Sequence, residues 1–597
     1  MSGRSHKTRM PRGSARHSSS PRPSRLAGIA QAADSSRAFV PIVVFAVIAA
    51  LFFVRLVYLQ IIVAPTYSAQ AQEARTVGFD IEPRRGTIYD RNGTVLAVSV
   101  DATTIYANPS EVEDIRSTAT ALAEVLGGEA TDYANKLSAN SSTFAFMQRK
   151  ADVDKAKQVK ELGLKGIYFL SDSRREYPNG QTGGQVIGVC QIAQDEATGR
   201  EYYAGITGLE LYYDKILSGT PGRYEAERGQ NGMPIPGGVR EQTPAVEGQD
   251  IMISLDIELQ QSVEERLVAE EGGLTAAGGS AVVMDGATGE IYAAASLPLF
   301  NPADRTEMKE GATKLKCATD LFEPGSIFKS VSTMAILESG TMTPESTIFC
   351  PSSIEADGYV ISDAHERGDA TFTLRQILDQ SSNVGISLST ENMGFDKLYD
   401  AIIRYNLHEK TGVDYPGENE AGTDILGALP AFKNWSKVVG YNVSFGQGVS
   451  VTPLQMTRFY GALANGGVEC TPHFLISKPQ TGETVEYATE QVIDNERALA
   501  DMTSMLQTVV TEGTGKKAAI EGYNVAGKTS TAEIYDEVNG GYRKGVYNLA
   551  FTGFLAGSSS QLVCFVGANE VPTDGVVTPI FKDIMSAAID RFNILPE

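Results

Sequence analysis

Histidine and cysteine are scarce in this 597-residue sequence, and their scarcity excludes several kinds of functional site. The five histidines are isolated from one another, so the sequence has neither zinc-ligand spacing nor any arrangement that resembles a Ser-His-Asp triad. The five cysteines are scattered without a C-x-x-C pair, and their odd number implies no disulfide framework. We therefore expect no metal and no cofactor.

Positive charge is also in deficit, because the formal net charge is -22 at pH 7. This balance argues against a nucleic-acid partner, and acidity by itself indicates little more than solubility. Hydrophobic residues make up 42% of the chain and charged residues 21%, which is ordinary for a globular protein. The length is several times that of a usual domain and predicts two or more domains.

The sequence has one long apolar run, directly after a basic N-terminal tail. Residues 1–37 contain eight basic residues against Asp34 alone, and we expect this tail to be disordered. Ala38 to Val54 are 17 residues without a charge, and the apolar character resumes after Arg55. At ~1.5 Å per residue the uncharged run covers roughly 26 Å, close to the hydrocarbon core of a bilayer.

We interpret residues 38–63 as an uncleaved transmembrane anchor. The competing interpretation is a cleaved signal peptide, since Ser68-Ala69-Gln70-Ala71 resembles a cleavage site. The apolar run is longer than the ~7–15 residues of a signal core, which favours the anchor. The positive tail then stays in the cytoplasm, and the chain after residue 64 lies outside it.

After the anchor, the pattern of predicted strands and helices changes near residue 245. Residues 64–245 form a mixed, turn-rich α+β region, with strand-like runs at 94–100 and 184–192 and a helical pattern at 112–126. In residues 246–597 strands are expected at both ends, with helices dominating about 326–465 between them. These expected elements are strands at 250–256, 279–285, 290–295, 523–526, 549–555 and 561–568, and helices at 257–270, 330–338 and 580–591. The second domain is thus expected to build one sheet from both ends of its sequence.

The clearest chemical signal is Glu323-Pro324-Gly325-Ser326-Ile327-Phe328-Lys329. Pro-Gly ends the preceding segment, so that Ser326 would begin a helix, where backbone N–H groups favour developing negative charge. Lys329 projects from the same helix face one turn later. A partly desolvated lysine can serve as the base that activates a serine. The alternative is that Ser326 is merely a helix cap, because Ser-x-x-Lys alone is a weak motif.

A second candidate element follows a helical run that begins at Leu374. Ser381-Ser382-Asn383 offers a hydroxyl for proton relay and an amide for holding a substrate peptide group, although it could equally be an ordinary helix-terminal turn. Another Ser-x-Asn, at residues 138–140, precedes the nucleophile in the first domain and is set aside.

The third element has two candidates. Lys410-Thr411-Gly412 matches a Lys-Thr-Gly motif literally but runs into a turn, where its lysine would be solvated. Lys528 to Thr531 follow an apolar strand, where a substrate chain can pair through backbone hydrogen bonds. We therefore take Lys528, Thr529, Ser530 and Thr531 as functional, with the lysine as a second cation near Lys329 and the three hydroxyls as ligands for a carboxylate.

Together these three elements resemble the Ser-x-x-Lys, Ser-x-Asn and Lys-Thr-Gly set of penicillin-binding proteins and serine β-lactamases. The resemblance extends over nearly everything after the anchor. Segments 85–93, 175–178 and 208–214 are similar to signatures of the pedestal of class B penicillin-binding proteins, and 445–448 with 452–455 to a stretch between the second and third motifs. The residues at 323–326 and 445–448 are more similar to those of the division-type branch than to those of the elongation-type branch.

The resemblance implies a pedestal domain used in dimerisation or partner binding (64–245) and an α/β transpeptidase domain (246–597). In the latter, an antiparallel sheet is flanked by helices and carries a helical subdomain. It also implies a D,D-transpeptidase that acts on D-Ala-D-Ala stem peptides in septal wall synthesis and is a target of β-lactams. By the family pattern, the backbone N–H groups of Ser326 and Thr531 would form the oxyanion hole. The same pattern implies that Ser382 takes part in the proton relay and that Asn383 holds the substrate amide. The implied partners are a SEDS-family glycosyltransferase and other division proteins in the membrane.

One position departs from the family pattern, since Ser530 stands where the family usually has glycine. Its side chain would either narrow the space beside the strand or add a hydrogen-bond donor. The rival interpretations are an elongation-type transpeptidase, a D,D-carboxypeptidase or β-lactamase that uses water as acceptor, and a β-lactam sensor or inactive scaffold. The pedestal and the anchor argue against a simple hydrolase, and the complete motif set argues against a scaffold.

Overall fold

A computed structural model describes most of the chain, and the described residues form two compact parts, each described by itself. One part comprises the described residues of 1–78 and 225–240, the other those of 79–224 and 241–597. The described residues are 35–67, 76–138, 145–194, 201–228, 234–269, 273–274, 278–418, 429–535, 542–571 and 577–596. Nearly all of the predicted basic tail, the cleavage-like Ser68 to Ala71, and Asn140 of the discarded motif lie outside these ranges.

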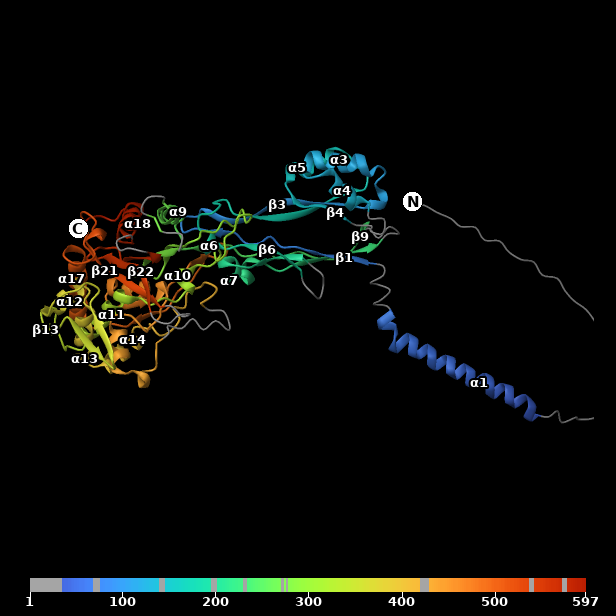
Figure 1. Ribbon diagram of the computed structural model, residues 1–597. Coiled ribbons are helices and arrows are strands. Elements are labelled where there is room, and N and C mark those ends of the chain that lie inside the picture. Colours follow the sequence, from blue (N-terminus) through green and yellow to red (C-terminus); the bar gives the residue numbers. More distant parts are fainter. Residues whose placement is uncertain are drawn as a thin grey trace, which may run out of the picture. The chain divides into compact units, whose positions relative to one another are not determined.

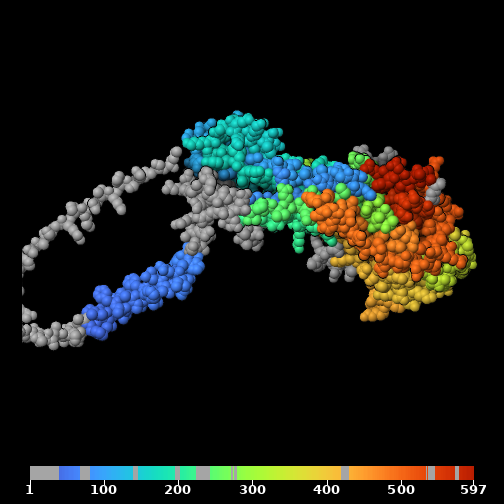
Figure 2. Space-filling view, turned by 180° about the vertical axis from the view of Figure 1, so that it is seen from behind, coloured from blue at the N-terminus to red at the C-terminus, as the bar shows by residue number. Residues whose placement is uncertain are grey.

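Helix α1 (Ser35–Val57) continues into the π-helical turn η1 (Tyr58–Ile62). Its segment Phe39–Ile62 is long and apolar enough to cross a membrane, and none of it is buried. Figure 2 shows this helix in blue, with its apolar side chains exposed along its length. This helix is consistent with a single-pass membrane anchor.

A seven-stranded sheet forms the core of the first domain of the larger part (Figure 1). Its order is β19-β18-β10-β2-β3-β4, with β5 also paired to β3. Its strands are β2 (Ile88–Tyr89), β3 (Val95–Ala107), β4 (Ala145–Ala151), β5 (Ile167–Glu176), β10 (Ile251–Ile253), β18 (Leu475–Lys478) and β19 (Glu483–Thr484). Helices α3 (Ile115–Leu126), α4 (Ala130–Leu137) and α5 (Val153–Glu161) bury their apolar faces in one cluster with β3, β4 and β5. Because β10 pairs in parallel with β2, the sheet continues across residue 245.

The strand expected at 184–192 is wrong in its first half. Gly184–Ile187 form the short buried helix α6, and the strand β6 (Cys190–Gln194) begins only afterwards. Gly183 and Gly188 bracket the helix with φ of 72° and 75°, in the left-handed region that glycine tolerates. Two apolar residues of the predicted strand, Val186 and Ile187, are therefore buried on a single helical turn.

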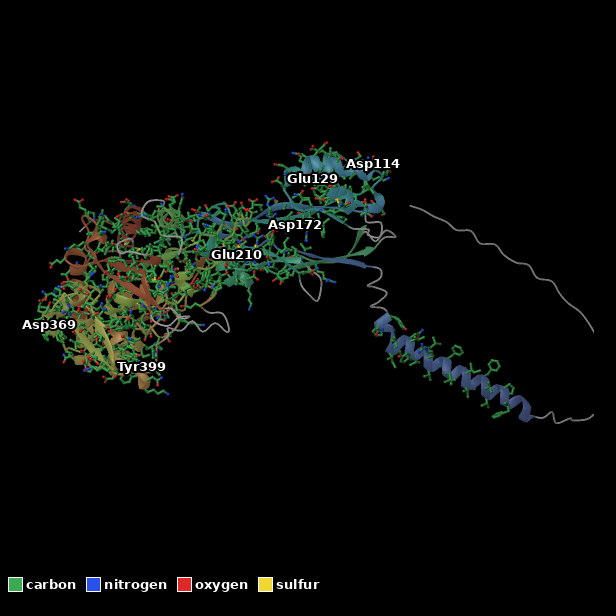
Figure 3. All side chains as sticks on the ribbon, viewed as in Figure 1. Asp114, Glu129, Asp172, Glu210, Asp369 and Tyr399 are labelled. Carbon is green, nitrogen blue, oxygen red and sulfur yellow. The ribbon has the colours of Figure 1, made fainter. Side chains whose placement is uncertain are left out.

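The three segments that resemble pedestal signatures meet around one buried carboxylate, Glu210, which is labelled in Figure 3. Arg85 donates from Nε to Glu210 Oε2 at 2.5 Å, and Arg175 donates from Nε to Oε1 at 2.7 Å. Burial alone would raise the pKa of Glu210, but the charges of Arg175 and Arg85 outweigh burial and hold the pKa below its usual value. Tyr213, close by in sequence, donates to Asp414 of the following domain. This bond connects the segment around Glu210 to the following domain.

The second domain contains a five-stranded antiparallel sheet in the order β12-β11-β23-β22-β21. Its strands are β11 (Gly279–Asp285), β12 (Ile291–Ser296), β21 (Val525–Tyr535), β22 (Tyr542–Leu555) and β23 (Leu562–Val571). The prediction of one sheet from both ends of the domain is confirmed for the strands expected at 279–295 and 523–568. The strand expected at 250–256 is instead β10 of the seven-stranded sheet. Helices α9 (Ile257–Val268) and α18 (Val577–Phe592) pack on one face, with Leu549 and Phe551, whereas Ala550 and Phe554 face the helical lobe.

The helical lobe covers the other face of this sheet. Its helices are α11 (Lys329–Glu338), α12 (Leu374–Asp379), α13 (Asn383–Met393), α14 (Phe395–Arg404), α15 (Lys437–Ser444), α16 (Pro453–Ala464) and α17 (Glu496–Thr511). Between α11 and α12 the chain forms two small antiparallel pairs that were not predicted. They are β13 (Thr347–Cys350) with β16 (Ala370–Thr373), and β14 (Ser353–Ala356) with β15 (Tyr359–Ser362).

The smaller elements complete the described chain. They are β1 (Thr76–Ile81), η2 (Pro109–Glu111), β7 (Glu201–Gly205), α7 (Gly208–Tyr212), α8 (Asp214–Leu217), β8 (Gly222–Arg228), β9 (Pro234–Thr243), α10 (Lys316–Thr319), η3 (Gly325–Phe328), η4 (Phe432–Asn434), β17 (Val468–Cys470), β20 (Thr489–Gln491) and η5 (Lys516–Ala518).

Candidate active site

Ser326 lies in the first turn of a helix that begins at Gly325. The 3₁₀ turn η3 runs directly into α11, so that Ser326 and Lys329 project one turn apart, as the sequence predicts. Gly325 has φ of 53°, and a Cβ atom on it would lie 2.6 Å from Oγ of Ser530. Only glycine therefore fits before the serine, both in backbone conformation and in space.

The segment 445–448 supports the same turn from the side of the helical lobe. Gly325 N donates to the carbonyl of Gly446 at 2.9 Å, and Gly448 N donates to Oε1 of Glu323 at 2.9 Å. Gly446 has φ of 83°, and a Cβ atom there would lie 2.2 Å from the carbonyl oxygen of Gly325. Gly446 is thus explained by how closely it approaches the backbone next to Ser326, whereas Gly448 is favoured by its φ of 67° alone.

The ammonium group of Lys329 is completely buried and lies among oxygen atoms of the first two predicted elements. Its Nζ atom is 2.9 Å from Oγ of Ser326 and 2.7 Å from Oδ1 of Asn383. It also lies 2.6 Å from the carbonyl oxygen and 3.1 Å from Oγ of Ser381. The structure therefore brings the predicted nucleophile, base and amide together at one point.

Two buried lysines have lowered pKa values in this cluster. Burial, and then the positive charge of Lys528, hold the pKa of Lys329 well below its usual value, whereas the carboxylate of Asp363 acts in the opposite direction. Burial lowers the pKa of Lys528 to about 7, against an opposing effect of Asp379. The neutral form of Lys329, which a base for Ser326 requires, is therefore more accessible than that of a lysine in water.

The relay role predicted for Ser382 does not agree with the geometry, and Ser381 occupies that place. The Ser382 hydroxyl donates to the carboxylate of Asp363 and accepts from Gly385 N at 2.9 Å as the N-cap of α13. Ser381 has φ of 56°, rare for a residue other than glycine, and this turns both its oxygen atoms towards Lys329. The spacing of Ser-x-Asn itself places the motif serine two positions before Asn383, at Ser381, and the sequence prediction overlooked this.

Asp363 organises the loop that carries Ser381 and was missed in the sequence. Its carboxylate accepts bonds from the Ser382 hydroxyl and from Val384 N, and it forms an ion pair with Arg367 at 2.6 Å. It lies just after β15, within the hairpins that the sequence did not predict. In the sequence, no motif or distinctive spacing marks Asp363, which stands only two positions before His365.

Strand β21 separates the four residues of the third element onto two faces. Thr531 is exposed, and the hydroxyl of Thr529 is 2.7 Å from that of Thr514. The substrate-binding role predicted for the side chain of Ser530 does not agree with the structure, because this residue is buried and donates to the carbonyl of Pro324 at 2.7 Å. Alternation along a strand places residue 530 on the opposite face from 529 and 531.

The position of β21 at the sheet edge leaves one side of its backbone open. β22 pairs with it from Val525 to Tyr535, and among the described residues no strand pairs with its other side. An extended peptide can add to such an edge through main-chain hydrogen bonds. Lys528, whose Nζ donates to the Thr529 carbonyl at 3.0 Å, lies buried beneath this edge.

The literal Lys410-Thr411-Gly412 motif is structural. The backbone and hydroxyl of Thr411 both donate to Glu418, at 2.8 and 2.9 Å, and its carbonyl accepts from Arg458. These bonds close a turn, so the motif takes no part in the cluster around Lys329. The prediction that residues 528–531, and not 410–412, form the third element is consistent with this geometry.

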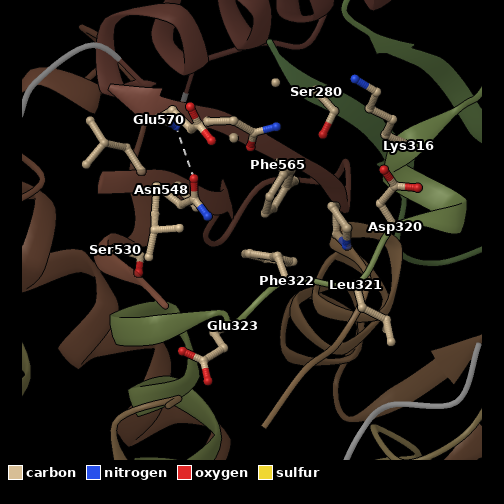
Figure 4. Close-up of a pocket in the computed structure, with 17 residues that line it drawn as sticks. Ser280, Lys316, Asp320, Leu321, Phe322, Glu323, Ser530, Asn548, Phe565 and Glu570 are labelled. Atoms are coloured by element: carbon tan, nitrogen blue, oxygen red, sulfur yellow. Dashed lines mark hydrogen bonds between the residues drawn. The ribbon is translucent and has the colours of Figure 1, made fainter. Parts of the chain in front are cut away.

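A cavity of about 260 Å³ lies behind the nucleophile turn, and Figure 4 shows its lining. Its floor is a row of paired small residues across the sheet, Ser530, Ala550, Gly567 and Ser280. Phe322 and Phe565 form part of its wall. Its lining includes Ser530 and Glu323 but neither Ser326 nor Lys329, so the cavity is adjacent to the catalytic cluster and separate from it.

Comparison with known families identifies both domains. The family described as "Penicillin binding protein transpeptidase domain" matches residues 279–586, and "Penicillin-binding Protein dimerisation domain" matches residues 80–253. The two matched ranges coincide with the sheet that carries the catalytic cluster and with the domain built around Glu210.

Individual relatives align over almost the whole chain. The chain is 31% identical to stage V sporulation protein D of Bacillus subtilis over 559 residues, covering 91% of this chain and 83% of that protein. It is 30% identical to peptidoglycan D,D-transpeptidase FtsI of Escherichia coli, covering 91% of this chain and 90% of that protein.

Solved structures show the same architecture. A peptidoglycan synthetase from Bifidobacterium adolescentis is 25% identical with a TM-score of 0.68, covering 88% of this chain and 98% of that one. Penicillin binding protein 3 of Mycobacterium tuberculosis, in complex with ampicillin, is 25% identical with a TM-score of 0.64, covering 87% of this chain and 98% of that one.

Proposed function

This chain belongs to the class B penicillin-binding proteins of the division type, and we propose that it cross-links peptidoglycan stem peptides with Ser326 as its nucleophile. One observation carries the assignment of the nucleophile. Ser326 Oγ lies 2.9 Å from the amine of Lys329, which is completely buried and whose pKa is lowered. Such an amine can accept the serine proton as Oγ attacks a carbonyl carbon.

In the acylation step, Ser326 attacks the carbonyl of the penultimate D-Ala of a D-Ala-D-Ala stem peptide. The donor stem adds to the open edge of β21, and its terminal carboxylate binds beside the hydroxyls of Thr529 and Thr531. Lys528 supports this edge from beneath through its bond to the Thr529 carbonyl. The backbone N–H groups of Ser326 and Thr531 stabilise the oxyanion. The proton taken by Lys329 passes through the Ser381 hydroxyl to the leaving nitrogen, so that terminal D-Ala departs as a neutral amine and an ester remains on Ser326.

In the second step, the amine of a neighbouring stem peptide attacks that ester. Lys329 accepts a proton from the attacking nitrogen and returns one to Oγ of Ser326, which restores the free enzyme. Asn383 orients the donor. The side chain of Asn383 is itself held in place, because its Oδ1 accepts a bond from Lys329 and its amide nitrogen donates to the Ser362 carbonyl. A β-lactam follows the first step only, and its acyl group stays on Ser326.

The cellular setting follows from the anchor and the family. Helix α1 would hold the protein in the cell membrane, with the N-terminus in the cytoplasm and the pedestal (64–245) and the transpeptidase domain (246–597) outside. The relatives of the division type support action in septal wall synthesis. The implied partners are a SEDS-family glycosyltransferase and other division proteins, which would meet the anchor and the pedestal.

The reaction is tested with a synthetic pentapeptide donor ending in D-Ala-D-Ala and a tetrapeptide acceptor that carries a free side-chain amine. We expect release of D-Ala together with a cross-linked dimer, both abolished in Ser326→Ala. Release of D-Ala without a dimer, at a rate independent of acceptor concentration, would instead indicate a carboxypeptidase. Depletion in cells adds the biological test, since filaments support a role in division and rounded cells support elongation.

A further inference from the structure

Ser530 forms a direct link between the two backbone segments of the proposed oxyanion hole. Its hydroxyl donates to the carbonyl oxygen of Pro324 at 2.7 Å, and the residue is only 4% exposed. Pro324 is two residues before Ser326, and Ser530 directly precedes Thr531. The bond therefore joins the nucleophile turn to strand β21 within two residues of each N–H group that would bind the oxyanion.

The space between the two segments is filled by the serine side chain itself. Gly325 passes directly over it, since a Cβ atom on Gly325 would lie 2.6 Å from Ser530 Oγ and 3.0 Å from the Cβ of Ala532. With glycine at position 530, as the family usually has, both the hydroxyl and its carbon would be missing from this contact. The side chain of Ser530 thus fills the space that glycine would leave and adds a hydrogen bond to the Pro324 carbonyl.

We propose that Ser530 is a positioning residue, which fixes the distance between the nucleophile turn and β21 and so sets the spacing of the two oxyanion donors. This inference rests on the proposed function. Loss of a whole oxyanion donor costs roughly 10²–10³-fold in rate. Looser spacing weakens both donors without removing either. We therefore expect the acylation rate constant to fall by roughly tenfold, which is less than the loss of a whole donor would cost.

The bond acts on the transition state rather than on ground-state binding, because negative charge develops on the carbonyl oxygen only as Ser326 attacks. The Ser530 hydroxyl faces Pro324, away from the exposed Thr531. Its removal should therefore lower the limiting rate of acylation and leave the initial non-covalent binding of a β-lactam unchanged. The pH dependence should also be unchanged, because the contacts of Lys329 do not include Ser530.

Three variants and one control separate this role from a merely structural one. Ser530→Ala removes only the hydroxyl, and Ser530→Gly gives the usual family residue. Ser530→Thr keeps the hydroxyl and places its extra methyl group towards the adjoining cavity of about 260 Å³ (Figure 4). Ser280→Ala is the matched control, because Ser280 lines the same cavity in the same row of the sheet, three strands away.

The experiment measures acylation of the full-length protein by a fluorescent penicillin over a range of concentrations. Rates are compared well below each melting temperature and separated into a limiting rate constant and an apparent dissociation constant. We expect Ser530→Ala and Ser530→Gly to lower the limiting rate roughly tenfold at an unchanged dissociation constant and an unchanged pH profile, as a fraction of the donor effect. Ser530→Thr should restore most of the rate, and Ser280→Ala should match the wild type.

Two results would overturn the inference. One is a Ser530→Ala limiting rate within about twofold of the wild type, below the ~10-fold effect expected from weakened donors. The other is a fall that appears entirely in the dissociation constant, which would make Ser530 a binding residue. Neither result affects the nucleophile assignment, whose failure would instead appear as wild-type protein that forms no adduct, or as an adduct in Ser326→Ala.

Discussion

The Nζ atom of Lys329 lies 2.9 Å from the Oγ atom of Ser326 and is shielded completely from solvent. Burial and the neighbouring charge of Lys528 hold the pKa of this amine well below its usual value. A lysine in water, with a pKa of about 10.4, would be almost fully protonated near neutral pH and could not act as a base. The pairing of these two residues is therefore chemically useful only because the helical lobe excludes water from it.

Exchanging Ser381 and Ser382 for alanine should separate catalysis from folding. Ser381→Ala removes the hydroxyl 3.1 Å from Lys329 and should slow acylation by roughly 10²-fold, as expected for a lost proton relay, with little change in melting temperature. Ser382→Ala removes the N-cap of α13 and a bond to Asp363, and should cost roughly 1–3 kcal/mol of stability. Stopped-flow acylation and thermal melting measure the two effects, and the reverse pattern would restore the relay to Ser382.

Removing the charge of Lys528 should shift the pH dependence of acylation. The active form has Lys329 neutral, so the rate rises with pH through the pKa of Lys329. The positive charge that Lys528 carries below its own pKa of about 7 lowers the pKa of Lys329, so Lys528→Met should raise it and move the rising limb to higher pH. The profile is measured as the acylation rate constant with a β-lactam between pH 5 and 10. A limb that stays in place would show that burial alone sets the pKa.

Removing the charge of Asp363 should produce a shift of the opposite sign. Its carboxylate raises the pKa of Lys329, so Asp363→Asn should lower that pKa and move the rising limb to lower pH. The asparagine also weakens the bonds to Ser382 and Val384, and the maximum rate should fall. The same assay measures both effects. A shift in the same direction as that of Lys528→Met would contradict the electrostatic explanation.

Substituting Glu210 should destabilise the pedestal without involving the catalytic residues. Glu210→Gln leaves Arg85 and Arg175 buried against a neutral amide, and loss of one partner of a buried pair costs roughly 3–5 kcal/mol. The matched control is Glu113→Gln, in the same domain, whose pairing with Lys165 is exposed and whose loss should leave the melting temperature unchanged. Differential scanning fluorimetry compares them. Equal melting temperatures for the two variants would show that the buried cluster does not stabilise the fold.

Local patterns were sufficient to predict the catalytic pair and the sheet that carries the third motif. Ser326 and Lys329 share one helical turn, and the strands on either side of the helical lobe have apolar runs that need no tertiary information. What the sequence could not supply depends on contacts between distant segments. The left-handed backbone of Ser381 has no local signal, and Asp363 reaches Val384 N from the loop after β15, a strand that the sequence did not predict.

The third motif shows the same limit. The sequence predicts Lys528 to Thr531 rather than the literal Lys410-Thr411-Gly412, because a strand and a turn differ in local sequence, and the structure has these segments on β21 and in a turn, respectively. The strand period of two would have placed Ser530 on the opposite face from Thr529 and Thr531, and the sequence prediction overlooked it. What Ser530 meets on that face, the Pro324 carbonyl 206 positions away, could only come from the fold.

The most direct test of the central claim is to locate the covalent adduct. The full-length protein is incubated with benzylpenicillin, digested and analysed by mass spectrometry, alongside Ser326→Ala and Lys329→Ala. We predict one penicilloyl group per wild-type chain, on the peptide that contains Ser326, and none on either variant. A penicilloyl group on any other serine, or one that persists in Ser326→Ala, would contradict the assignment of Ser326 as the nucleophile.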